Sequence, residues 1–245
     1  MDWPDAAIYV PEIRGFDPPS LFAKALCETI PVEPDDAGLI DLGCGVGIVG
    51  IFCLVRRKAK AVTFVDVLPE AIAATQANVS YHIARQTIHA SQVSYVTEGF
   101  SHLPPSVLAS GNLIAFNPPQ LPAALTDTKY LKAVQGSTIQ RTFRLGGPYG
   151  LSVIGEFLKW YASLRSPKPR AVMLVSSFLG RRQIQSAFDQ YGLQASVIKE
   201  TIVPLRACLT RAADSFSTLG DEMHNRSLTR SGGTWSKKLL TMQVA

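Results

Sequence analysis

The chain has 245 residues, of which 47% are hydrophobic and 18% are charged, and its formal net charge is +5. This composition supports a sizeable core and excludes a disordered or low-complexity chain. The modest positive charge permits an anionic substrate but does not require a nucleic acid. The four cysteines contain no CxxC pair and the four histidines show no ligand spacing. A disulfide framework and a metal site are therefore not predicted.

The periodicity of apolar residues predicts helices that alternate with short strands. A first helix, capped by Ser20, is expected to run to about Ile30. The strands expected after it are short apolar or β-branched runs, at residues 39–42, 61–65, 93–96, 113–116 and 171–175. The helices expected between and after them cover 45–55, a segment opened by Pro69, 151–161 and 184–191. This alternation predicts a doubly wound α/β fold with a mostly parallel sheet.

The C-terminal part is expected to complete a seven-stranded sheet. Residues 196–203 and 207–212 are predicted to pair as a terminal antiparallel hairpin. One domain is expected over 1–213, in which 121–147 lack a clear period and are interpreted as a lid or insertion. Residues 214–245 are rich in Ser, Thr, Gly and basic residues, and we expect a polar, partly mobile tail there.

The chain shows no sequence feature that would direct it to a membrane. No basic segment followed by an apolar run stands near its beginning, so a signal peptide is not expected. The most apolar stretch, 37–55, contains Asp41 and five glycines, which argues against a membrane span. A cytoplasmic protein without a membrane partner is predicted.

A glycine-rich segment joins the first predicted strand to the next helix, with the sequence Asp41-Leu-Gly43-Cys-Gly45-Val-Gly47. Glycines at such a turn let the backbone bend sharply and let a ligand lie against bare main chain. Asp66 ends the following strand, where a carboxylate can accept hydrogen bonds from ribose hydroxyls. Together these residues predict a site for an adenosine-containing cofactor.

Two cofactor classes compete for this site. Gly45-x-Gly47-x-x-Gly50 matches the fingerprint of dinucleotide-binding proteins, which would favour an NAD-dependent oxidoreductase. Asp41 argues against that alternative, because a carboxylate before the glycine turn repels a pyrophosphate and attracts a cationic amino group. A nucleoside that carries an amino acid fits the pattern better.

The segment from Asp41 to Gly47 resembles the first motif of class I methyltransferases, and Asp66 resembles the acidic end of their second strand. The resemblance implies a Rossmann-like methyltransferase fold and S-adenosyl-L-methionine as the cofactor, with no metal. The family also has an acidic residue after the third strand, which holds the adenine amino group. Gly99 occupies that position here, so Glu98 beside it, or the main chain alone, is expected to serve. The cofactor-binding residues implied are Asp41, Gly43, Gly45, Gly47, Asp66, Val67, Glu98 and Asn117.

A second motif, Asn117-Pro118-Pro119-Gln120, stands at the end of the fourth predicted strand. The prolines stiffen the turn and remove N–H donors, so the Asn117 side-chain oxygen and the Pro118 carbonyl can both accept from one amino group. Such a pair of acceptors aims the nitrogen lone pair at the methyl group. The motif resembles the Asn-Pro-Pro-aromatic motif of enzymes that methylate adenine, guanine or glutamine amide nitrogen. Residues 145–151 resemble the Gly-Gly-x-x-Gly-Leu of the glutamine branch.

Gln120 departs from the aromatic residue of that branch. An amide cannot stack on a planar base as an aromatic ring does, although it can form hydrogen bonds, so a flipped base is a less expected acceptor. The residues expected to be catalytic are Asn117, Pro118 and Gln120. The residues expected to contact the substrate are Phe16, Pro119, Gln120 and Tyr149.

The sequence thus predicts an enzyme that transfers a methyl group from S-adenosylmethionine to a nitrogen of a small-molecule acceptor. A nucleic-acid partner is not expected. One alternative is a methyltransferase that acts on a protein glutamine or an RNA base. An alternative of another class is a non-catalytic subunit that binds S-adenosylmethionine. The sequence leaves the acceptor and the oligomeric state open.

Overall fold

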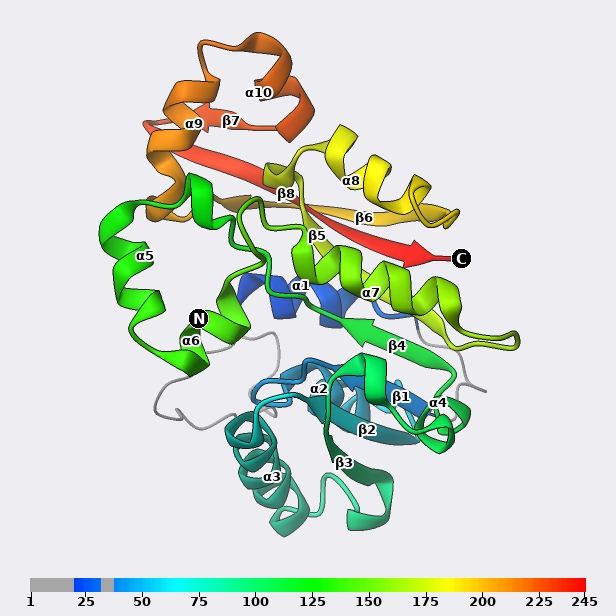
Figure 1. The fold of residues 1–245 in the computed structure, drawn as a ribbon. Coiled ribbons are helices and arrows are strands. Elements are labelled where there is room, and N and C mark those ends of the chain that lie inside the picture. The colour runs from blue at the N-terminus through cyan, green and yellow to red at the C-terminus, as the bar shows by residue number, and fades with distance from the viewer. Residues whose placement is uncertain (1–19, 32–37) are drawn as a thin grey trace. The chain divides into compact units, whose positions relative to one another are not determined.

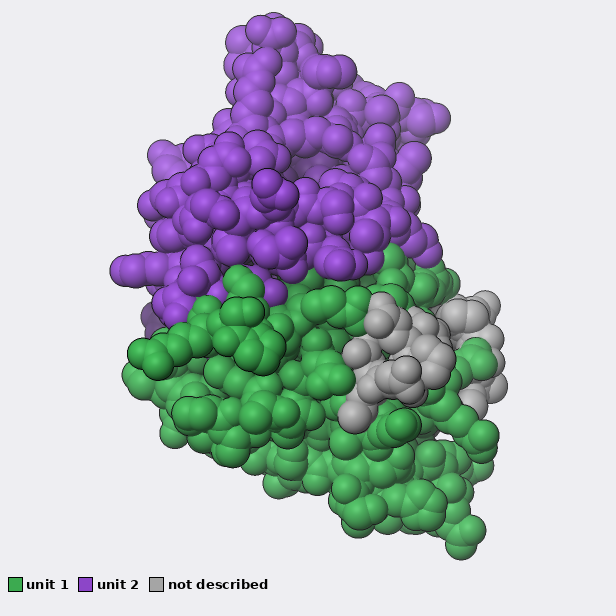
Figure 2. Space-filling model, turned by 90° about the vertical axis from the view of Figure 1, so that its right-hand side faces the viewer, with its two compact units in different colours: residues 1–117, 164–173 green, residues 118–163, 174–245 purple. Residues whose placement is uncertain are grey.

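The computed structural model describes residues 20–31 and 38–245 and has a mixed α/β fold (Figure 1). The chain divides into two compact units, shown in different colours in Figure 2. Unit 1 comprises residues 1–117 and 164–173, and unit 2 comprises residues 118–163 and 174–245. Among the described residues, no helix combines the length and the apolar character needed to cross a bilayer.

Unit 1 is a parallel sheet with helices. Its strands are β1 (Gly38–Leu42), β2 (Ala61–Asp66), β3 (Val93–Thr97), β4 (Leu113–Phe116) and the beginning of β5 (Arg170–Ser176), in the order β3-β2-β1-β4-β5. Its helices are α1 (Leu21–Thr29), α2 (Ile48–Val55), α3 (Pro69–Ala84) and α4 (Pro105–Ser110), with short 3-10 turns η1 (Ala90–Gln92) and η2 (Phe100–His102). Every strand pair in this unit is parallel. The predicted strand over 113–116 coincides with β4.

Local sequence signals explain how the helices of unit 1 begin and end. Ser20 accepts a hydrogen bond from the Ala23 N–H at 3.2 Å and so caps α1, as predicted. Pro69 is the first residue of α3, where its missing N–H has no helical partner to lose. The Lys58 ammonium donates to the carbonyls of Cys27 and Ile30, at 3.0 Å each. This lysine therefore satisfies the C-terminal end of α1, where a cation is favoured by the helix dipole.

The core of unit 1 packs α2 closely against the sheet. All residues of β1 are buried, as are most of β2 and α2. At Gly50 of α2 a Cβ atom would lie 2.3 Å from the Phe64 ring and 2.7 Å from the Val62 side chain. Only glycine lets the helix approach the sheet at this point, and the contact fixes the position of the loop before α2.

Unit 2 combines six helices with an antiparallel sheet. The helices are α5 (Thr128–Gln135), α6 (Thr138–Arg144), α7 (Ser152–Ser163), α8 (Arg181–Asp189), α9 (Thr210–Phe216) and α10 (Gly220–Arg226). The 3-10 turns are η3 (Ala123–Leu125), η4 (Ser177–Leu179) and η5 (Ala207–Leu209). The strands are the end of β5, β6 (Ala195–Pro204), β7 (Thr229–Ser231) and β8 (Thr234–Val244), in the order β5-β8-β6 with β7 on β8.

The fold class is as predicted, a mostly parallel Rossmann-like sheet with an antiparallel end, but the predicted hairpin is wrong in its second strand. Residues 207–212 form η5 and the beginning of α9, and the antiparallel partner of β6 is β8. Their register runs from Ala195 opposite Val244 to Pro204 opposite Ser236. The principal sheet path holds seven strands, and β7 is an eighth beside β8.

The segments predicted as a tail and a lid both contain regular structure. Within 214–245, instead of a polar mobile tail, the chain forms α10, β7 and β8. β8 buries Trp235, Leu239 and Leu240, which gives it a fixed place in the core of unit 2. The segment 121–147 holds η3, α5 and α6.

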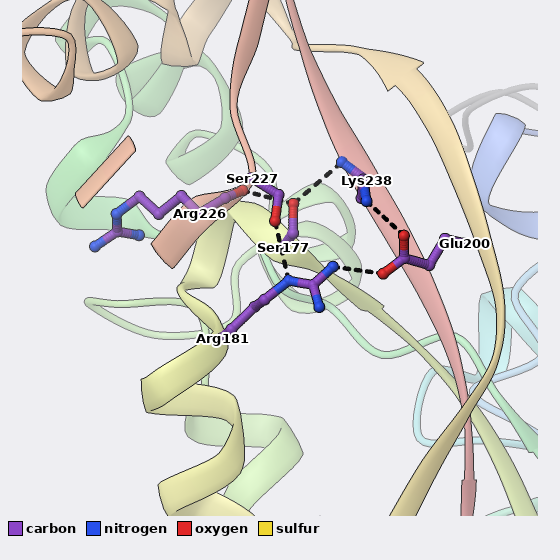
Figure 3. A network of polar contacts seen from close by, with 6 residues as sticks. All are labelled: Ser177, Arg181, Glu200, Arg226, Ser227 and Lys238. Carbon is purple, nitrogen blue, oxygen red and sulfur yellow. Dashed lines mark hydrogen bonds and ion pairs between the residues drawn. The ribbon is translucent and has the colours of Figure 1, made fainter. Parts of the chain in front are cut away.

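A polar network connects the elements of unit 2 (Figure 3). The Ser177 hydroxyl donates to the Arg226 carbonyl at 2.7 Å and accepts from the Lys238 N–H at 3.1 Å. Glu200 of β6 accepts from Lys238 at 2.6 Å and also pairs with Arg181. The hydrogen bonds from these two cations lower the pKa of the Glu200 carboxyl. The network ties η4, α8 and both long antiparallel strands together.

Candidate active site

The glycine loop between β1 and α2 adopts a backbone that favours glycine at three positions. The φ angles of Gly43, Gly45 and Gly47 are +63°, +58° and +79°, a region that strains other residues. A Cβ atom at Gly45 would meet no atom of the described residues within 4 Å, so this part of the structure leaves that side of the loop open. This bare stretch of main chain is the surface against which a ligand can lie.

Two side chains of α3 hold this loop in place. The Thr75 hydroxyl donates to the Gly45 carbonyl at 3.0 Å, and the Asn78 amide donates to the Val46 carbonyl at 2.7 Å. Both side chains are fully buried. Neither residue was identified from the sequence, although polar residues on the buried face of α3 were a signal for such a role. They position the loop and do not themselves face a ligand.

Asp41 lies just before the glycine loop and is 3% exposed. Its carboxylate accepts a hydrogen bond from the Gly50 N–H at 2.8 Å. Burial raises the pKa of this carboxyl to about 8; the Gly50 hydrogen bond opposes the shift, and the nearby Asp66 charge adds to it. An ammonium group at this place would stabilise the carboxylate and reverse the shift.

Asp66 ends β2 and is 9% exposed. One carboxylate oxygen accepts from the Gly45 N–H at 2.9 Å, and the other accepts from the Leu68 N–H at 3.0 Å. Burial raises the pKa of this carboxyl, while the backbone hydrogen bonds lower it. Each oxygen keeps a second lone pair for a ribose hydroxyl. Val67, the next residue, is 57% exposed and supplies apolar surface beside the carboxylate.

Glu98 lies at the same end of the sheet as Asp66. The register of β2 and β3 places Thr97 opposite Asp66, so Glu98 follows the residue paired with that aspartate. The Glu98 side chain is exposed, and Gly99 directly precedes the turn η2. The predicted position of an acceptor for the adenine amino group is therefore accessible.

The residues at the carboxyl ends of β1, β2 and β3 fit S-adenosylmethionine. Asp41 can neutralise its ammonium group, Asp66 can accept from its ribose, and Val67 offers apolar surface to its adenine. The open side of Gly45 leaves room for the chain that joins these groups. In the described part of the chain, no group of three or more His, Cys, Asp or Glu side chains is placed to hold a metal ion.

Asn117 follows β4 at this same end of unit 1. Phe116 is paired with Leu42 of β1, so Asn117 and Gly43 both follow paired residues. The Asn117 side chain is half-buried, and within the described residues it forms no hydrogen bond. Its amide therefore keeps its hydrogen-bonding capacity for another molecule.

Gln120, in unit 2, has a different role from the predicted contact with the acceptor. Its side chain is buried, and its amide nitrogen donates to the Leu174 carbonyl at 3.0 Å and to the Pro118 carbonyl at 3.4 Å. Its amide oxygen accepts from the Ser176 N–H at 2.7 Å. Because the amide pairs with the backbone of β5 as a strand would, it is not directed at a substrate. We correct the assignment: Gln120 is a positioning residue for the Pro118–Pro119 turn.

The segment 145–151 is attached to the residues that follow the two prolines. The Leu121 N–H donates to the Arg144 carbonyl at 2.9 Å, and the Gly146 N–H donates to the Leu121 carbonyl at 3.1 Å. A Cβ atom at Gly146 would lie 2.7 Å from the Pro119 carbonyl oxygen. The segment after Asn117 and the segment 145–151 are thus close in space, although Gln120 and Gly146 are 26 residues apart in the sequence.

The other residues predicted to contact the substrate differ in exposure. Tyr149 is 70% exposed, so its ring is available for contact. Pro119 is half-buried. Phe16 lies outside the described residues.

Comparison with known proteins finds one family model and several similar structures. Residues 17–132 match the family model described as methyltransferase small domain. No curated protein matches the chain in sequence. In structure the chain is similar to the YcgJ protein from Bacillus subtilis, with a TM-score of 0.51 and 12% identity over 91% of this chain and 96% of that chain.

Two further solved structures are similar at lower scores. A precorrin-6y C5,15-methyltransferase from Geobacter metallireducens has a TM-score of 0.48 and 10% identity, over 91% of this chain and 85% of that chain. TYW2 from Pyrococcus horikoshii, solved in complex with MeSAdo, has a TM-score of 0.48 and 13% identity, over 94% of this chain and 64% of that chain. The chain thus shares the fold of the YcgJ protein, and its residues 17–132, which are 116 of the 245 residues, match the methyltransferase small domain. This matched part contains the glycine loop and the strand-end carboxylates, whose arrangement fits S-adenosylmethionine.

Proposed function

We propose that this protein is an S-adenosylmethionine-dependent methyltransferase that transfers the methyl group to a nitrogen of a small-molecule acceptor. The observation that carries the proposal is the position of Asn117, which follows β4 at the edge of unit 1 where Asp41 and Asp66 lie. Its side-chain amide forms no hydrogen bond within the described residues. Pro118 follows it and has no N–H, so no donor of that residue competes for the acceptors at this point. The Asn117 side-chain oxygen therefore suits an acceptor that carries N–H groups.

The residues of the chain contribute orientation to this reaction. S-adenosylmethionine, when bound, would supply a methyl group on a sulfonium, and a neutral amine can attack that methyl carbon without a metal. A carbon–nitrogen bond would form as the carbon–sulfur bond breaks, S-adenosylhomocysteine would leave as a neutral thioether, and the nitrogen would then lose a proton to solvent. The Asn117 side-chain oxygen accepts an N–H of the acceptor and thereby holds the nitrogen lone pair toward the methyl carbon. The same contact stabilises the positive charge that develops on the nitrogen.

The orientation of Gln120 favours a small acceptor over a flipped base. Its side chain pairs with the backbone of β5, so position 120 offers no flat surface on which a base can stack. The alternatives remain a protein glutamine and an RNA base. The test is an assay of purified protein with labelled S-adenosylmethionine and separate pools of small amines, glutamine-containing peptides and RNA. Label in the amine pool is the expected result, and label only in peptide or RNA would reject the proposed acceptor class.

Asp66→Ala is expected to weaken the binding of S-adenosylhomocysteine by about tenfold or more, since it removes hydrogen bonds between a carboxylate and ribose hydroxyls. Isothermal titration calorimetry measures the dissociation constant, and a parallel titration with NAD should show no binding. Glu70→Ala removes an exposed carboxylate in the first turn of α3 and serves as the matched control. An unchanged dissociation constant in Asp66→Ala would show that this carboxylate only supports the glycine loop.

Cofactor binding is expected to release a proton from Asp41 near pH 7. The raised pKa of about 8 keeps this carboxyl mostly protonated in the free protein, and the cofactor ammonium favours the carboxylate. The affinity should therefore rise as the pH increases toward 8, because a proton is lost on binding. Calorimetry at pH 7 in two buffers with different ionisation enthalpies measures the protons released. Asp41→Asn should release fewer protons than the parent, and equal release would assign the effect to another group, such as Asp66.

A further inference from the structure

The positive charge of the chain is concentrated in unit 2. This unit holds 14 lysine and arginine residues against seven aspartates and glutamates, whereas unit 1 holds 10 against 12. The net charge of +5 for the whole chain therefore conceals one basic unit and one mildly acidic unit. A basic surface attracts polyanions and raises the rate at which they associate with it. Unit 2 is thus the part of the chain that suits a polyanionic partner.

The helices α5 and α6 of unit 2 present part of this charge to solvent (Figure 1). Residues 128–155, which contain both helices, include four cations and no carboxylate. Lys129, Lys132 and Arg141 are exposed, and none of these three forms an ion pair within the described residues. Lys129 and Lys132 are three residues apart on α5, so their side chains lie on the same side of that helix. These three side chains are called the basic face below.

The other side of the two helices is fixed to the core of unit 2. Val134 of α5 is 1% exposed, and Tyr130 packs against a buried cluster that includes Trp235. The Tyr130 hydroxyl accepts a hydrogen bond from Arg144 at 2.7 Å, so this arginine serves the inner side and is not counted in the basic face. Asp127 caps α5 by accepting from its second N–H at 2.9 Å. The basic face is therefore carried by helices that are held from within.

An exposed aromatic ring follows these helices. Tyr149 is 70% exposed. The N–H groups of Ala123 and Ala124 donate to the carbonyls of Gly147 and Pro148, at 3.0 and 2.8 Å. The segment directly before α5 is thus bonded to the segment that follows α6, and the φ angle of +85° at Gly147 suits glycine in this tight loop. These bonds hold the ring of Tyr149 near the base of the helix pair.

We propose that the basic face and Tyr149 form a docking surface for single-stranded RNA. Lysine and arginine side chains neutralise phosphates of any sequence. An exposed tyrosine ring offers a flat face on which an unpaired base can stack. Unpaired loops of RNA present both groups, whereas duplex DNA keeps its bases stacked on one another. An acidic protein segment would meet the cations but would give the ring no base to stack on.

This inference goes beyond the proposed function and does not rest on it. The docking surface belongs to unit 2 alone, and it concerns how a partner is held rather than the atom that receives the methyl group. The sequence considered as a whole predicts no nucleic-acid partner, because its average charge is modest. The separation of charge appears only when the chain is divided into its two compact units.

The first test is the binding of a fluorescent, unstructured RNA to the full chain, measured by fluorescence anisotropy at several salt concentrations. One phosphate for each of the three cations gives a slope of about −2 when the logarithm of the association constant is plotted against that of the salt concentration. Lys132→Gln and Arg141→Gln should each bring this slope closer to zero by about 0.7 and weaken binding about fivefold near 0.1 M salt.

Lys159→Gln is the matched control for these two variants. Lys159 is also exposed and belongs to unit 2, but it lies on α7, one turn after Glu156. This variant removes the same charge from the unit, so it should leave the slope unchanged and bind RNA within about twofold of the parent. Equal losses in Lys132→Gln and Lys159→Gln would show general attraction to a basic unit and would overturn the proposal.

Tyr149 is tested by a different signature. Tyr149→Ala should weaken RNA binding by about tenfold because it removes a stacking surface. The salt dependence should stay as in the parent, since stacking releases no counterions. Tyr149→Phe keeps the ring and should bind within about twofold of the parent. Equal losses in the alanine and phenylalanine variants would reject stacking on this ring.

Two other polyanions and the methyl-transfer assay complete the test. Tighter binding of duplex DNA or of polyglutamate than of the RNA would overturn the proposal, because neither offers an unpaired base. RNA binding without methylation of any small amine would support the docking surface and reject only the proposed function. Methylation of an amine without RNA binding would have the reverse meaning. Label transferred to the bound RNA itself would support the docking surface and reject the small-molecule acceptor.

Discussion

Replacing Asn117 by alanine is expected to lower kcat by about a hundredfold or more, because a loss of orientation at the reacting nitrogen has effects of that size. The dissociation constant of S-adenosylmethionine should stay within about threefold of the parent value, since the main cofactor contacts come from β1 and β2. The side-chain amide of Asn117 forms no hydrogen bond within the described residues, so its removal should leave the stability of unit 1 nearly unchanged. Single-turnover rates and calorimetry measure the two effects separately.

Asn112→Ala is the matched control for this experiment. Asn112 precedes the same strand at its opposite end, and its side chain is exposed. This variant should keep the parent kcat. If Asn117→Ala also kept its turnover within a few-fold of the parent, the amide would not orient the acceptor and the proposed nitrogen chemistry would lose its support.

The sequence predicts unit 1 well because its signals are local. The predicted strand over 113–116 coincides with β4, and the strand predicted over 61–65 differs from β2 only by Asp66 at its end. Buried parallel strands are continuous apolar runs, and the glycine loop carries its own backbone requirement. The positions of Asp41 and Asp66 follow from the order of strand, loop, helix and strand, and the structure places both at the edge expected for them.

The antiparallel end of the fold could not be predicted in the same way. β8 contains two adjacent lysines, of which Lys237 is buried and Lys238 pairs with Glu200. Such residues hide the apolar pattern of a strand when the sequence is considered alone. Local signals favour residues 207–212 as the partner of β6, because they would form a hairpin with a short connection. The pairing of β6 with β8 instead depends on packing within unit 2, which the sequence does not display.

The role of α3 in the site was also beyond the sequence. Thr75 and Asn78 bond to carbonyls of the glycine loop about 30 residues earlier in the chain. A buried polar residue on an amphipathic helix can be recognised as a partner of the glycine loop only when the position of that loop is known. The direction of the Gln120 side chain presents the same difficulty, because its partners lie on β5, 54 and 56 residues further on.

Gln120→Leu is expected to destabilise the protein by at least about 2 kcal/mol, since it removes the side-chain partner of two backbone groups and each unsatisfied group costs about 1–3 kcal/mol. The groups concerned are the Leu174 carbonyl and the Ser176 N–H, which the Gln120 amide bonds at 3.0 and 2.7 Å. Leucine has a similar volume, so the loss of stability reports the hydrogen bonds rather than a cavity. Urea unfolding followed by circular dichroism measures the free energy of unfolding.

Two variants give this prediction its controls. Gln185→Leu makes the same change on the exposed side of α8 and should alter the free energy of unfolding by less than about 0.5 kcal/mol. Gln120→Glu keeps an oxygen for the Ser176 N–H but turns a second oxygen toward the Leu174 carbonyl, so it should also destabilise the protein, and more at neutral pH than at acidic pH, where the buried carboxyl is protonated. If Gln120→Leu instead unfolded like the parent while kcat/KM on the true acceptor fell, the amide would have been bound to the substrate, as the sequence predicted. The expected result is the reverse, with lower stability and cofactor affinity retained, because Gln120 supports the Pro118–Pro119 turn from the protein side.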